Sequence, residues 1–270
     1  MRKPQKDTAM QIYIDTCVLP RCHMECAGYY RDCFGPEIGF ELLPMFDLPD
    51  FEANLRQNLS LFEKGPLIFH EPVWGVEHSA RKGSPAYEAS MYHVRLTQKY
   101  AEILQPTDMV YHLNNCRVLP SQKDRMLSVT LENLEEMRDL FPDVRLLVEN
   151  TGTKAEGNLL LDQAEFTDLC REKGFGLVID VGHAHANGWD LFPLIRELKS
   201  QIRVFHLHNN FGHLDEHNRI GLGTIDFDAL IPFIRDTVPD AKLVIEYLKP
   251  VYHGQPLKDD IRSLMRAISL

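Results

Sequence analysis

Short apolar runs recur along the chain, and each ends in a residue that can bind a metal or move a proton. Two examples are Gly176–Val181, which contains Asp180, and Ile202–His208, which contains His206. A strand that is apolar along its body and polar at its carboxyl end is typical of a parallel barrel with its site at one face. The pattern therefore predicts buried parallel strands with chemistry at their carboxyl ends.

Eight such runs alternate with segments of helical periodicity. The predicted strands are Gln11–Cys17, Ile38–Leu43, Pro66–His70, Asp108–His112, Val144–Asn150, Gly176–Val181, Ile202–His208 and Ala241–Tyr247. The predicted helices are Leu48–Glu63, Ser84–Leu104, Ser121–Leu140, Asp162–Lys173, Leu191–Lys199, Asp226–Val238 and Pro256–Ile268. Strict alternation implies parallel strands joined by right-handed crossovers. The sequence thus predicts an α/β fold, a single (β/α)8 TIM barrel over residues 11–270, after a flexible leader over residues 1–10.

Composition and charge narrow the function classes. Of the 270 residues, 44% are hydrophobic and 25% are charged, which is ordinary for a chain that buries a sizeable core. The formal net charge of −10 argues against broad binding to nucleic acid or to anionic membranes, because both usually need a basic face. No signal peptide and no membrane-spanning run is evident, so we expect a cytoplasmic protein without a membrane partner.

Nine histidines and carboxylates are predicted at one face of the barrel. They comprise the ends of strands three to eight and three residues of the following loops: His70, His112, Glu149, Asp180, His206 and Glu246, then His183, Asp215 and His217. Burying so many carboxylates without cations would be very costly. We therefore expect one to three divalent metal ions per chain. Zinc and manganese suit these ligands best, with magnesium, cobalt or iron as alternatives.

Three residues are candidates for substrate contact, and one of them, His183, is also among the nine. His183 lies in the loop just beyond the strand-six carboxylate, and Trp74 lies just past strand three. An indole ring there could stack on a sugar or a base, although loop packing is an equal alternative. His208 lies beside the ligand set, and its spacing is expected to place it off the metal face.

Four cysteines fall close together near the amino end, at Cys17, Cys22, Cys26 and Cys33. Their spacing matches no metal motif with a clear physical basis, because paired Cys-x-x-Cys is absent. Two interpretations stay open: a thiolate metal site, or reduced thiols on a loop and helix near the barrel mouth.

Several motifs together resemble the xylose isomerase-like barrel superfamily. They are LLVEN around Glu149, IDVGHAHANGWD around Asp180 and His183, FHLHNN around His206, DEHNRIGLG around Asp215 and His217, and VIEY at Glu246. The resemblance covers nearly the whole chain. The superfamily includes metal-dependent sugar isomerases and epimerases and the endonuclease IV-type apurinic endonucleases.

The two branches imply different uses of the same residues. In the sugar-epimerase branch, one metal would be held by Glu149, Asp180, His206 and Glu246. Glu149 and Glu246 would also be the catalytic acid/base pair for proton transfer next to a carbonyl, and His183 would contact a substrate oxygen. The implied substrate is a small polyhydroxy compound, a sugar or sugar phosphate.

The endonuclease branch implies three zinc ions and phosphoester hydrolysis. Its ligand sets are His70, His112 and Glu149 for the first ion; Glu149, Asp180, His206 and Glu246 for the second; and His183, Asp215 and His217 for the third. All nine positions are present here. Hydroxide between two ions would attack phosphorus.

The sequence departs from the endonuclease pattern where that branch contacts DNA. The segment after His70 reads Glu-Pro-Val-Trp-Gly, the segment after strand seven reads His-Leu-His-Asn-Asn in place of His-Leu-Asn-Asp, and residues 44–54 contain no basic side chain. Binding a bent DNA needs cations against phosphates. The sequence therefore favours a metal-dependent sugar isomerase or epimerase. The alternatives are a zinc phosphoesterase, acting on abasic DNA or on a small phosphate ester, and a non-catalytic metal- or sugar-binding barrel.

Overall fold

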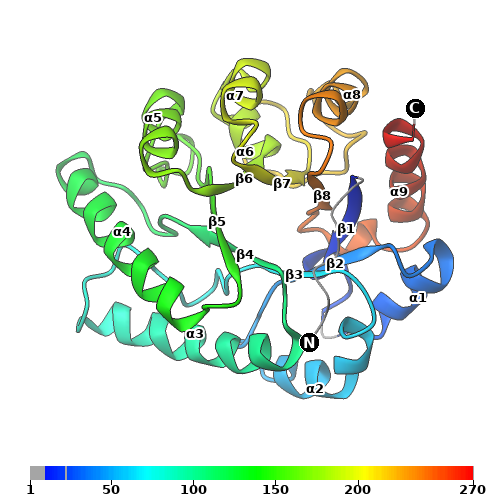
Figure 1. Ribbon diagram of the computed structural model, residues 1–270, viewed down its shortest axis with the longest axis horizontal. Coiled ribbons are helices and arrows are strands. Elements are labelled where there is room, and N and C mark those ends of the chain that lie inside the picture. Colours follow the sequence, from blue (N-terminus) through cyan, green and yellow to red (C-terminus); the bar gives the residue numbers. More distant parts are fainter. Residues whose placement is uncertain (1–9, 22, 270) are drawn as a thin grey trace.

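The eight apolar runs form the strands of a closed parallel barrel in the computed structural model, which describes residues 10–21 and 23–269 (Figure 1). The strands follow one another around the barrel in chain order. Their bounds are β1 Gln11–Asp15, β2 Gly39–Leu42, β3 Leu67–Phe69, β4 Asp108–His112, β5 Arg145–Glu149, β6 Gly176–Asp180, β7 Ile202–Leu207 and β8 Lys242–Ile245. The predicted TIM barrel is confirmed.

Helices surround the barrel as the alternation predicts. They are α1 Cys26–Phe34, α2 Phe51–Phe62, α3 Pro85–Leu104, α4 Lys123–Leu140, α5 Gln163–Lys173, α6 Val181–Ala186, α7 Leu191–Leu198, α8 Phe227–Thr237 and α9 Gln255–Ile268, with short 3-10 turns at Thr16–Val18, Pro120–Gln122 and Pro250–Tyr252. Of the predicted leader, only Met10 lies within the described residues. Within those residues, no helix has both the length and the apolar character that crossing a membrane requires.

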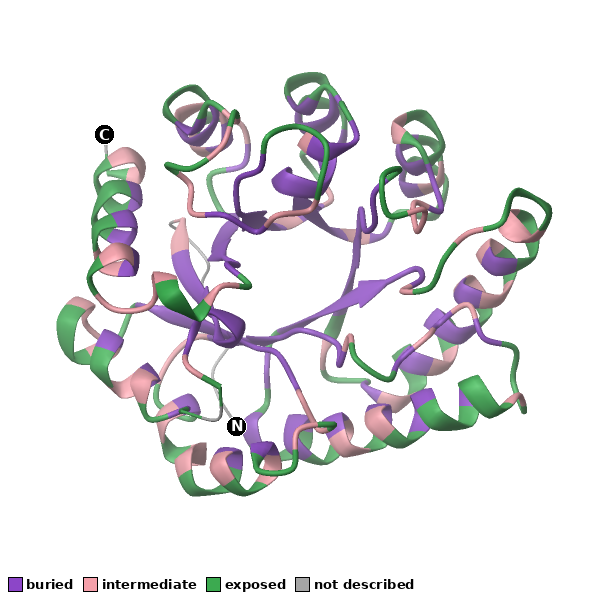
Figure 2. Ribbon diagram, turned by 180° about the vertical axis from the view of Figure 1, so that it is seen from behind, coloured by how far each residue is buried: buried purple, intermediate pink, exposed green. Residues whose placement is uncertain are grey.

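The core has two layers, because the strands are buried on both faces (Figure 2). Inside the barrel, side chains from seven strands pack into one cluster: Tyr13, Ile68, Val110, Leu147, Val178, Val204 and Val244. A larger cluster lies between the strands and the helices that surround them. Burial on both faces explains why the strands read as continuous apolar runs instead of alternating ones.

The strand register brings polar ends together. His112 on β4 is paired with Glu149 on β5, and Asp180 on β6 is paired with His206 on β7. All pairs are parallel, so the carboxyl ends of all eight strands face the same end of the barrel. This end carries the predicted site.

The predicted placement of His183 is wrong. His183 was expected in a loop, but it belongs to the six-residue helix α6, which begins directly after β6. The helix forms there because the Asp180 carboxylate caps it, accepting a hydrogen bond from the His183 backbone N–H at 2.6 Å. The cap ties the orientation of His183 to that of Asp180.

The cysteine-rich segment divides between a turn and α1. Cys17 is buried, and its Sγ lies 3.6 Å from the carbonyl oxygen of Tyr247. Cys26 and Cys33 lie at opposite ends of α1, with Cys33 exposed, whereas Cys22 lies outside the described residues. None of the described cysteines belongs to a group with metal-ligand spacing. These positions favour separate thiols over a shared thiolate site.

Candidate metal centre

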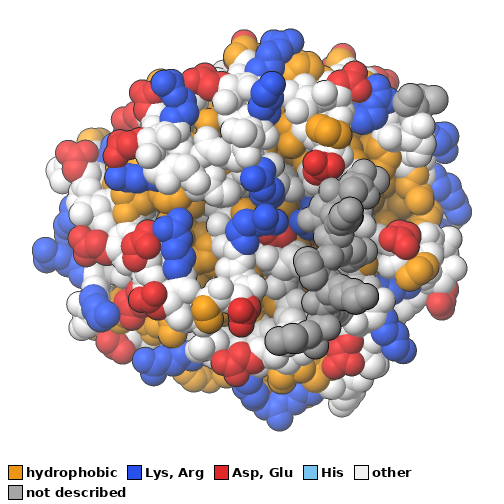
Figure 3. All heavy atoms as spheres, viewed as in Figure 1, with side chains coloured by type: hydrophobic (Ala, Val, Ile, Leu, Met, Phe, Trp, Pro, Cys, Tyr) orange, Lys and Arg blue, Asp and Glu red, His pale blue; other side chains and the backbone are white. Residues whose placement is uncertain are grey.

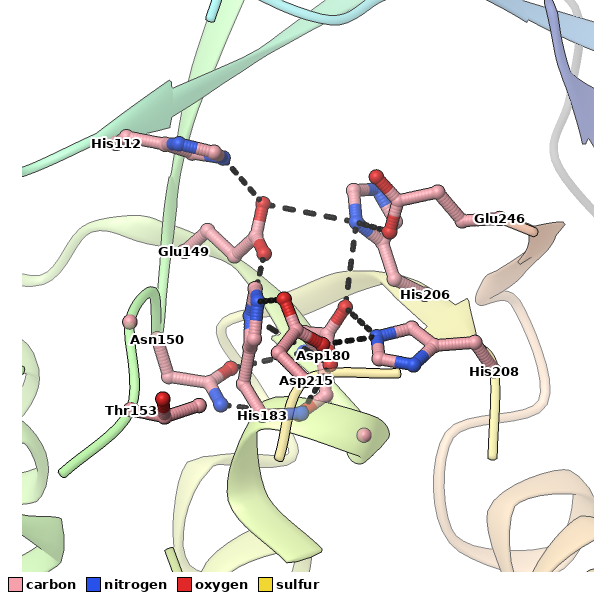
Figure 4. Close-up of polar contacts among 12 residues, drawn as sticks. His112, Glu149, Asn150, Thr153, Asp180, His183, His206, His208, Asp215 and Glu246 are labelled. Atoms are coloured by element: carbon pink, nitrogen blue, oxygen red, sulfur yellow. Dashed lines mark hydrogen bonds and ion pairs between the residues drawn. The ribbon is translucent and has the colours of Figure 1, made fainter. Parts of the chain in front are cut away.

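The structure brings all nine predicted ligands together at the carboxyl end of the barrel. Figure 4 labels these residues except His70 and His217. Six come from the ends of β3–β8 or the residue just beyond, one comes from α6, and two come from the loop between β7 and α8. Every one except Asp215 is buried, and Asp215 is half-buried. They fall into overlapping groups whose ligand atoms lie within 4.8 Å of one another.

The inner group centres on His206. Its Nδ1 lies 3.2 Å from Glu246 Oε2, 3.5 Å from Glu149 Oε2 and 3.8 Å from Asp180 Oδ2. Three carboxylates from three strands thus face one imidazole nitrogen. Such a set of one nitrogen and three oxygens suits a divalent ion.

A second group shares Glu149 with the first. His112 Nε2 lies 3.1 Å from Glu149 Oε2, and His70 Nε2 lies 3.9 Å from the same oxygen. The two imidazole rings meet edge to face, with centroids 4.8 Å apart. Glu149 is therefore placed to bridge two ions.

A third group is built on the Asp-x-His segment. Asp215 Oδ2 lies 3.0 Å from His217 Nε2 and 3.2 Å from His183 Nε2. His183 Nδ1 in turn lies 3.2 Å from Glu149 Oε1. The third group is thus connected to the other two through His183 and Glu149.

Hydrogen bonds on the far side of several rings set their tautomers. His70 Nδ1 lies 2.8 Å from the carbonyl oxygen of Glu71, and His217 Nδ1 lies 2.9 Å from that of Glu246. A carbonyl oxygen can only accept, so each Nδ1 carries the proton and each Nε2 presents its lone pair to the cluster. Metal-binding histidines are oriented in this way.

Glu41 on β2 is a site residue that was not predicted from the sequence. This carboxylate is fully buried, and its Oε2 lies 3.2 Å from His206 Nε2, opposite the ring nitrogen that faces the inner group. A proton on Nε2 leaves the His206 Nδ1 lone pair directed at three carboxylates. The sequence signal was present, since a lone glutamate inside the apolar run IGFELL needs a buried partner.

Glu71, in the loop after β3, forms a second supporting network. Its Oε2 lies 2.7 Å from His78 Nε2 and accepts a hydrogen bond from the His112 backbone N–H at 3.1 Å. Its Oε1 accepts a hydrogen bond from Asn115 Nδ2. Asn115 Oδ1 in turn lies within hydrogen-bond distance of His112 Nδ1, at 2.8 Å. Glu71 therefore positions both the backbone and the ring of His112.

Unpartnered atoms show that these residues fit metal ions. His183 Nδ1, His206 Nδ1, Asp215 Oδ1 and Glu246 Oε2 are buried and form no hydrogen bond within the described part of the chain. Leaving buried polar atoms without partners is costly, and a lone pair facing a carboxylate adds repulsion. A cation between these atoms would remove both costs.

The electrostatics agree with this picture. Burial raises the pKa of Glu149, but the imidazoles of His206 and His112 outweigh burial and hold it well below the usual range. Burial lowers the pKa of His112, whereas Glu149 and Glu71 raise it, to a net value of about 9. Without metal, protons on the imidazoles would thus compensate the carboxylates.

The expectation that His208 lies off the metal face is wrong. His208 is fully buried, and its Nε2 lies 3.0 Å from Asp180 Oδ2. Side chains alternate along a strand, so His208 shares the inward face with His206, two residues earlier. His208 and Glu41 thus join the nine predicted residues in groups with metal-ligand spacing.

Trp74 lies at the rim. Its side chain is 44% exposed and lines a cavity of about 390 Å³ together with Met45, Phe51 and Leu248. The described residues that line this cavity include none of the nine predicted ligands. A substrate contact by Trp74 stays a prediction.

Comparison with known proteins agrees with this geometry. Residues 74–268 match the family model described as "Xylose isomerase-like TIM barrel". The chain belongs to this family. No curated protein matches the chain.

Solved structures share the fold at low identity. A D-tagatose 3-epimerase-like protein has a TM-score of 0.70 at 17% identity, covering 95% of this chain and 99% of that one. The IOLI protein, solved with a bound zinc atom, has a TM-score of 0.72 at 16% identity, covering 96% of both chains. Endonuclease IV from Thermus thermophilus has a TM-score of 0.69 at 18% identity, covering 96% of this chain and 99% of that one. The neighbours of this family member thus include both epimerase-like and endonuclease structures.

Proposed function

We propose that this family member is a metal-dependent isomerase or epimerase of a small polyhydroxy carbonyl compound. One observation carries the proposal. Glu149 on β5 and Glu246 after β8 both face His206 Nδ1, at 3.5 and 3.2 Å. Moving a proton from one face of a carbon to the other needs two groups beside one site, and two buried carboxylates supply them.

Glu149, Asp180, His206 and Glu246 would hold the divalent ion, with zinc and manganese suiting this donor set best. When bound, such an ion polarises a carbonyl and its neighbouring hydroxyl, which makes the adjacent C–H bond more acidic. Glu149 would accept the proton from carbon, and Glu246 would return one from the other side. His183 would orient a substrate oxygen, because its ring links Glu149 to Asp215.

Hydrolysis of a phosphate ester is the second candidate. The groups around His70 and His112 and around Asp215 and His217 support it, because three ions serve hydrolysis more directly than enolisation. Abasic DNA is the less favoured substrate. Residues 44–54, which follow β2, contain no basic side chain that could contact phosphates. Figure 3 shows the opposite face, at the amino ends of the strands, where Lys and Arg side chains are interspersed with Asp and Glu.

Isotope exchange tests the first proposal. The metal-loaded protein is incubated with a panel of ketoses, ketose phosphates and related carbonyl compounds in deuterium oxide and followed by proton NMR. We expect deuterium at the carbon next to the carbonyl in at least one compound. Glu149→Gln and Glu246→Gln should abolish product formation, whereas Glu156→Gln, which alters an exposed glutamate, should not.

The same preparation is offered p-nitrophenyl phosphate esters and an abasic-site oligonucleotide at low salt. Hydrolysis of either, together with no exchange on any carbonyl compound, would replace isomerisation by phosphoester hydrolysis. Turnover that survives in Glu149→Gln would remove this residue from the chemistry.

A further inference from the structure

His208 changes the third ligand group from three donors to four. Its Nε2 lies 3.8 Å from Asp215 Oδ1, and the donor atoms of His183, His208, Asp215 and His217 all lie within 4.8 Å of one another. We propose that these four residues form a closed zinc site, distinct from the inner group, in which His208 is a direct ligand. The inference rests on the proposed metal centre and not on which reaction it catalyses.

The separations approach those of tetrahedral zinc. Bonds of about 2.0–2.1 Å at tetrahedral angles place neighbouring donors about 3.4 Å apart. The distances from Asp215 are 3.0 Å to His217, 3.2 Å to His183 and 3.8 Å to His208. His208 and His217 form a stacked pair, and the Nε2 atom of each ring faces the Asp215 carboxylate. A small rotation of the Asp215 carboxylate would bring one oxygen into the set.

The surrounding chain is shaped to admit the His208 ring. The ring stacks on His217, with centroids 3.8 Å apart and planes 12° from parallel. On the side of α6, a Cβ at Gly182 would lie 2.0 Å from His208 Cε1, so only glycine leaves room there. Asn210 Nδ2 donates to the Gly182 carbonyl at 2.8 Å and holds α6 against the end of β7.

Unpartnered atoms point to a ligand at this position. Asp215 Oδ1 is buried and forms no hydrogen bond in the described structure, and it lies 3.8 Å from His208 Nε2. His217 donates its Nδ1 proton to the Glu246 carbonyl, so a neutral ring directs its Nε2 lone pair at Asp215 Oδ2, 3.0 Å away. An ion shared by the four residues satisfies these atoms together.

A closed site has a consequence for function. Structural zinc sites use four protein ligands, whereas catalytic sites keep one position open. With His208 bound, the ion would join α6, the end of β7 and the loop that carries Asp215 and His217, and it would offer no position to a phosphate oxygen. Substrate would then bind only at the inner group and the neighbouring group of His70, His112 and Glu149. Losing the third ion as a substrate site favours isomerisation over three-ion hydrolysis.

A crystal structure of the full chain loaded with zinc tests the inference directly. We expect zinc at about 2.0–2.1 Å from His208 Nε2. An ion held by His183, Asp215 and His217, with His208 beyond bonding distance and still paired with Asp180, would overturn it. Zinc at the inner group but not at this site would also overturn it and leave the proposed centre standing. Zinc at neither position would overturn both.

A matched pair of variants gives a second readout in solution. His208→Asn should lower the affinity for one zinc ion by more than the roughly 10–100-fold typical of an outer hydrogen-bond partner, and should leave the other ions in place. His213→Asn changes an exposed histidine of the same loop and should retain wild-type zinc content. Competition with a chromogenic chelator measures both. Unchanged affinity in a correctly folded His208→Asn variant would contradict the role of His208 as a ligand.

Discussion

The two ends of the barrel both bury charged side chains, but they balance them differently. At the amino end of the strands, Asp108 accepts hydrogen bonds from Lys242 Nζ at 3.1 Å and from Arg145 Nε at 2.5 Å. Burial raises the pKa of Asp108, but these two cations outweigh it and hold the pKa below its usual value. At the carboxyl end, by contrast, buried ligand atoms such as His206 Nδ1 and Glu246 Oε2 form no hydrogen bond with the described residues.

This difference in charge balance indicates that the amino end of the barrel serves stability and the carboxyl end serves function. The amino end neutralises its carboxylate with the protein's own cations, so it needs nothing from outside. The carboxyl end accumulates carboxylates and aligned lone pairs that only an added cation, or protons, can balance. In TIM barrels the carboxyl end is also where chemistry is placed. Changes at the two ends should therefore have separable effects.

The largest effect on folding is expected from the amino end. Lys242→Met removes one partner of a buried pair and should lower the free energy of unfolding by about 3–5 kcal/mol. Zinc content should not change. Denaturant unfolding and elemental analysis measure the two quantities. Lys242→Met combined with Asp108→Leu should recover much of the loss, and equal stability of the single and double variants would contradict the pairing.

Metal removal should affect the carboxyl end alone. At a zinc concentration of 100 times the dissociation constant, one bound ion adds about 2.7 kcal/mol of stability. The melting temperature should therefore fall when a chelator is added to the wild-type protein, and fall less in Glu149→Gln. Identical melting curves with zinc and with chelator would show that the carboxyl end is balanced without a metal.

Glu41 provides a smaller, more specific test. Glu41→Gln keeps the size of the side chain but removes the charge beside His206 Nε2. Zinc affinity should fall by about 10–100-fold, the range for outer partners of metal-binding histidines. Glu37→Gln, which alters an exposed glutamate just before β2, is the control. Equal affinity of the two variants would remove Glu41 from the support of the metal centre.

The smallest predicted effect is a pH dependence of the metal-free protein. The pKa of His112 and that of His217 are each raised to about 9, because nearby carboxylates outweigh the lowering effect of burial. Raised folded-state values stabilise the protein below the unfolded pKa of about 6.5, and this stability is lost as the pH rises toward 9. Between pH 7 and 8 we expect a loss of about 1 kcal/mol per group, measured by urea unfolding. Zinc-loaded protein should lack this slope, since metal replaces the protons.

The fold could be predicted from sequence because the decisive signal is local. Each strand is a short apolar run, and the structure places all eight within two or three residues of their predicted bounds. The nine polar strand-end and loop residues were found for the same reason. Whether these residues act as ligands stays a prediction.

The residues that were missed depend on contacts far apart in the chain. Glu41 meets His206 across 165 positions, and Glu71 meets Asn115 across 44. No local pattern predicts such pairs. The placement of His208 could have been predicted, because side chains two residues apart lie on the same face of a strand and His206 faces inward. His183 lies in a helix because the Asp180 carboxylate caps the first turn. Gly182 in the same turn disfavours a helix, and the balance between the two effects is hard to predict from sequence.

The close approach of Gly182 and His208 constrains the order in which this site can change over evolutionary time. Any side chain at Gly182 would collide with the imidazole ring, so substitution there is blocked while His208 remains. Replacement of His208 by a smaller residue would have to come first and would open the space. A lineage that had lost the histidine could then fill position 182 freely, but its return would require glycine to be restored beforehand. The two positions therefore have to change in a fixed order, and sequences that carry the histidine should carry the glycine as well.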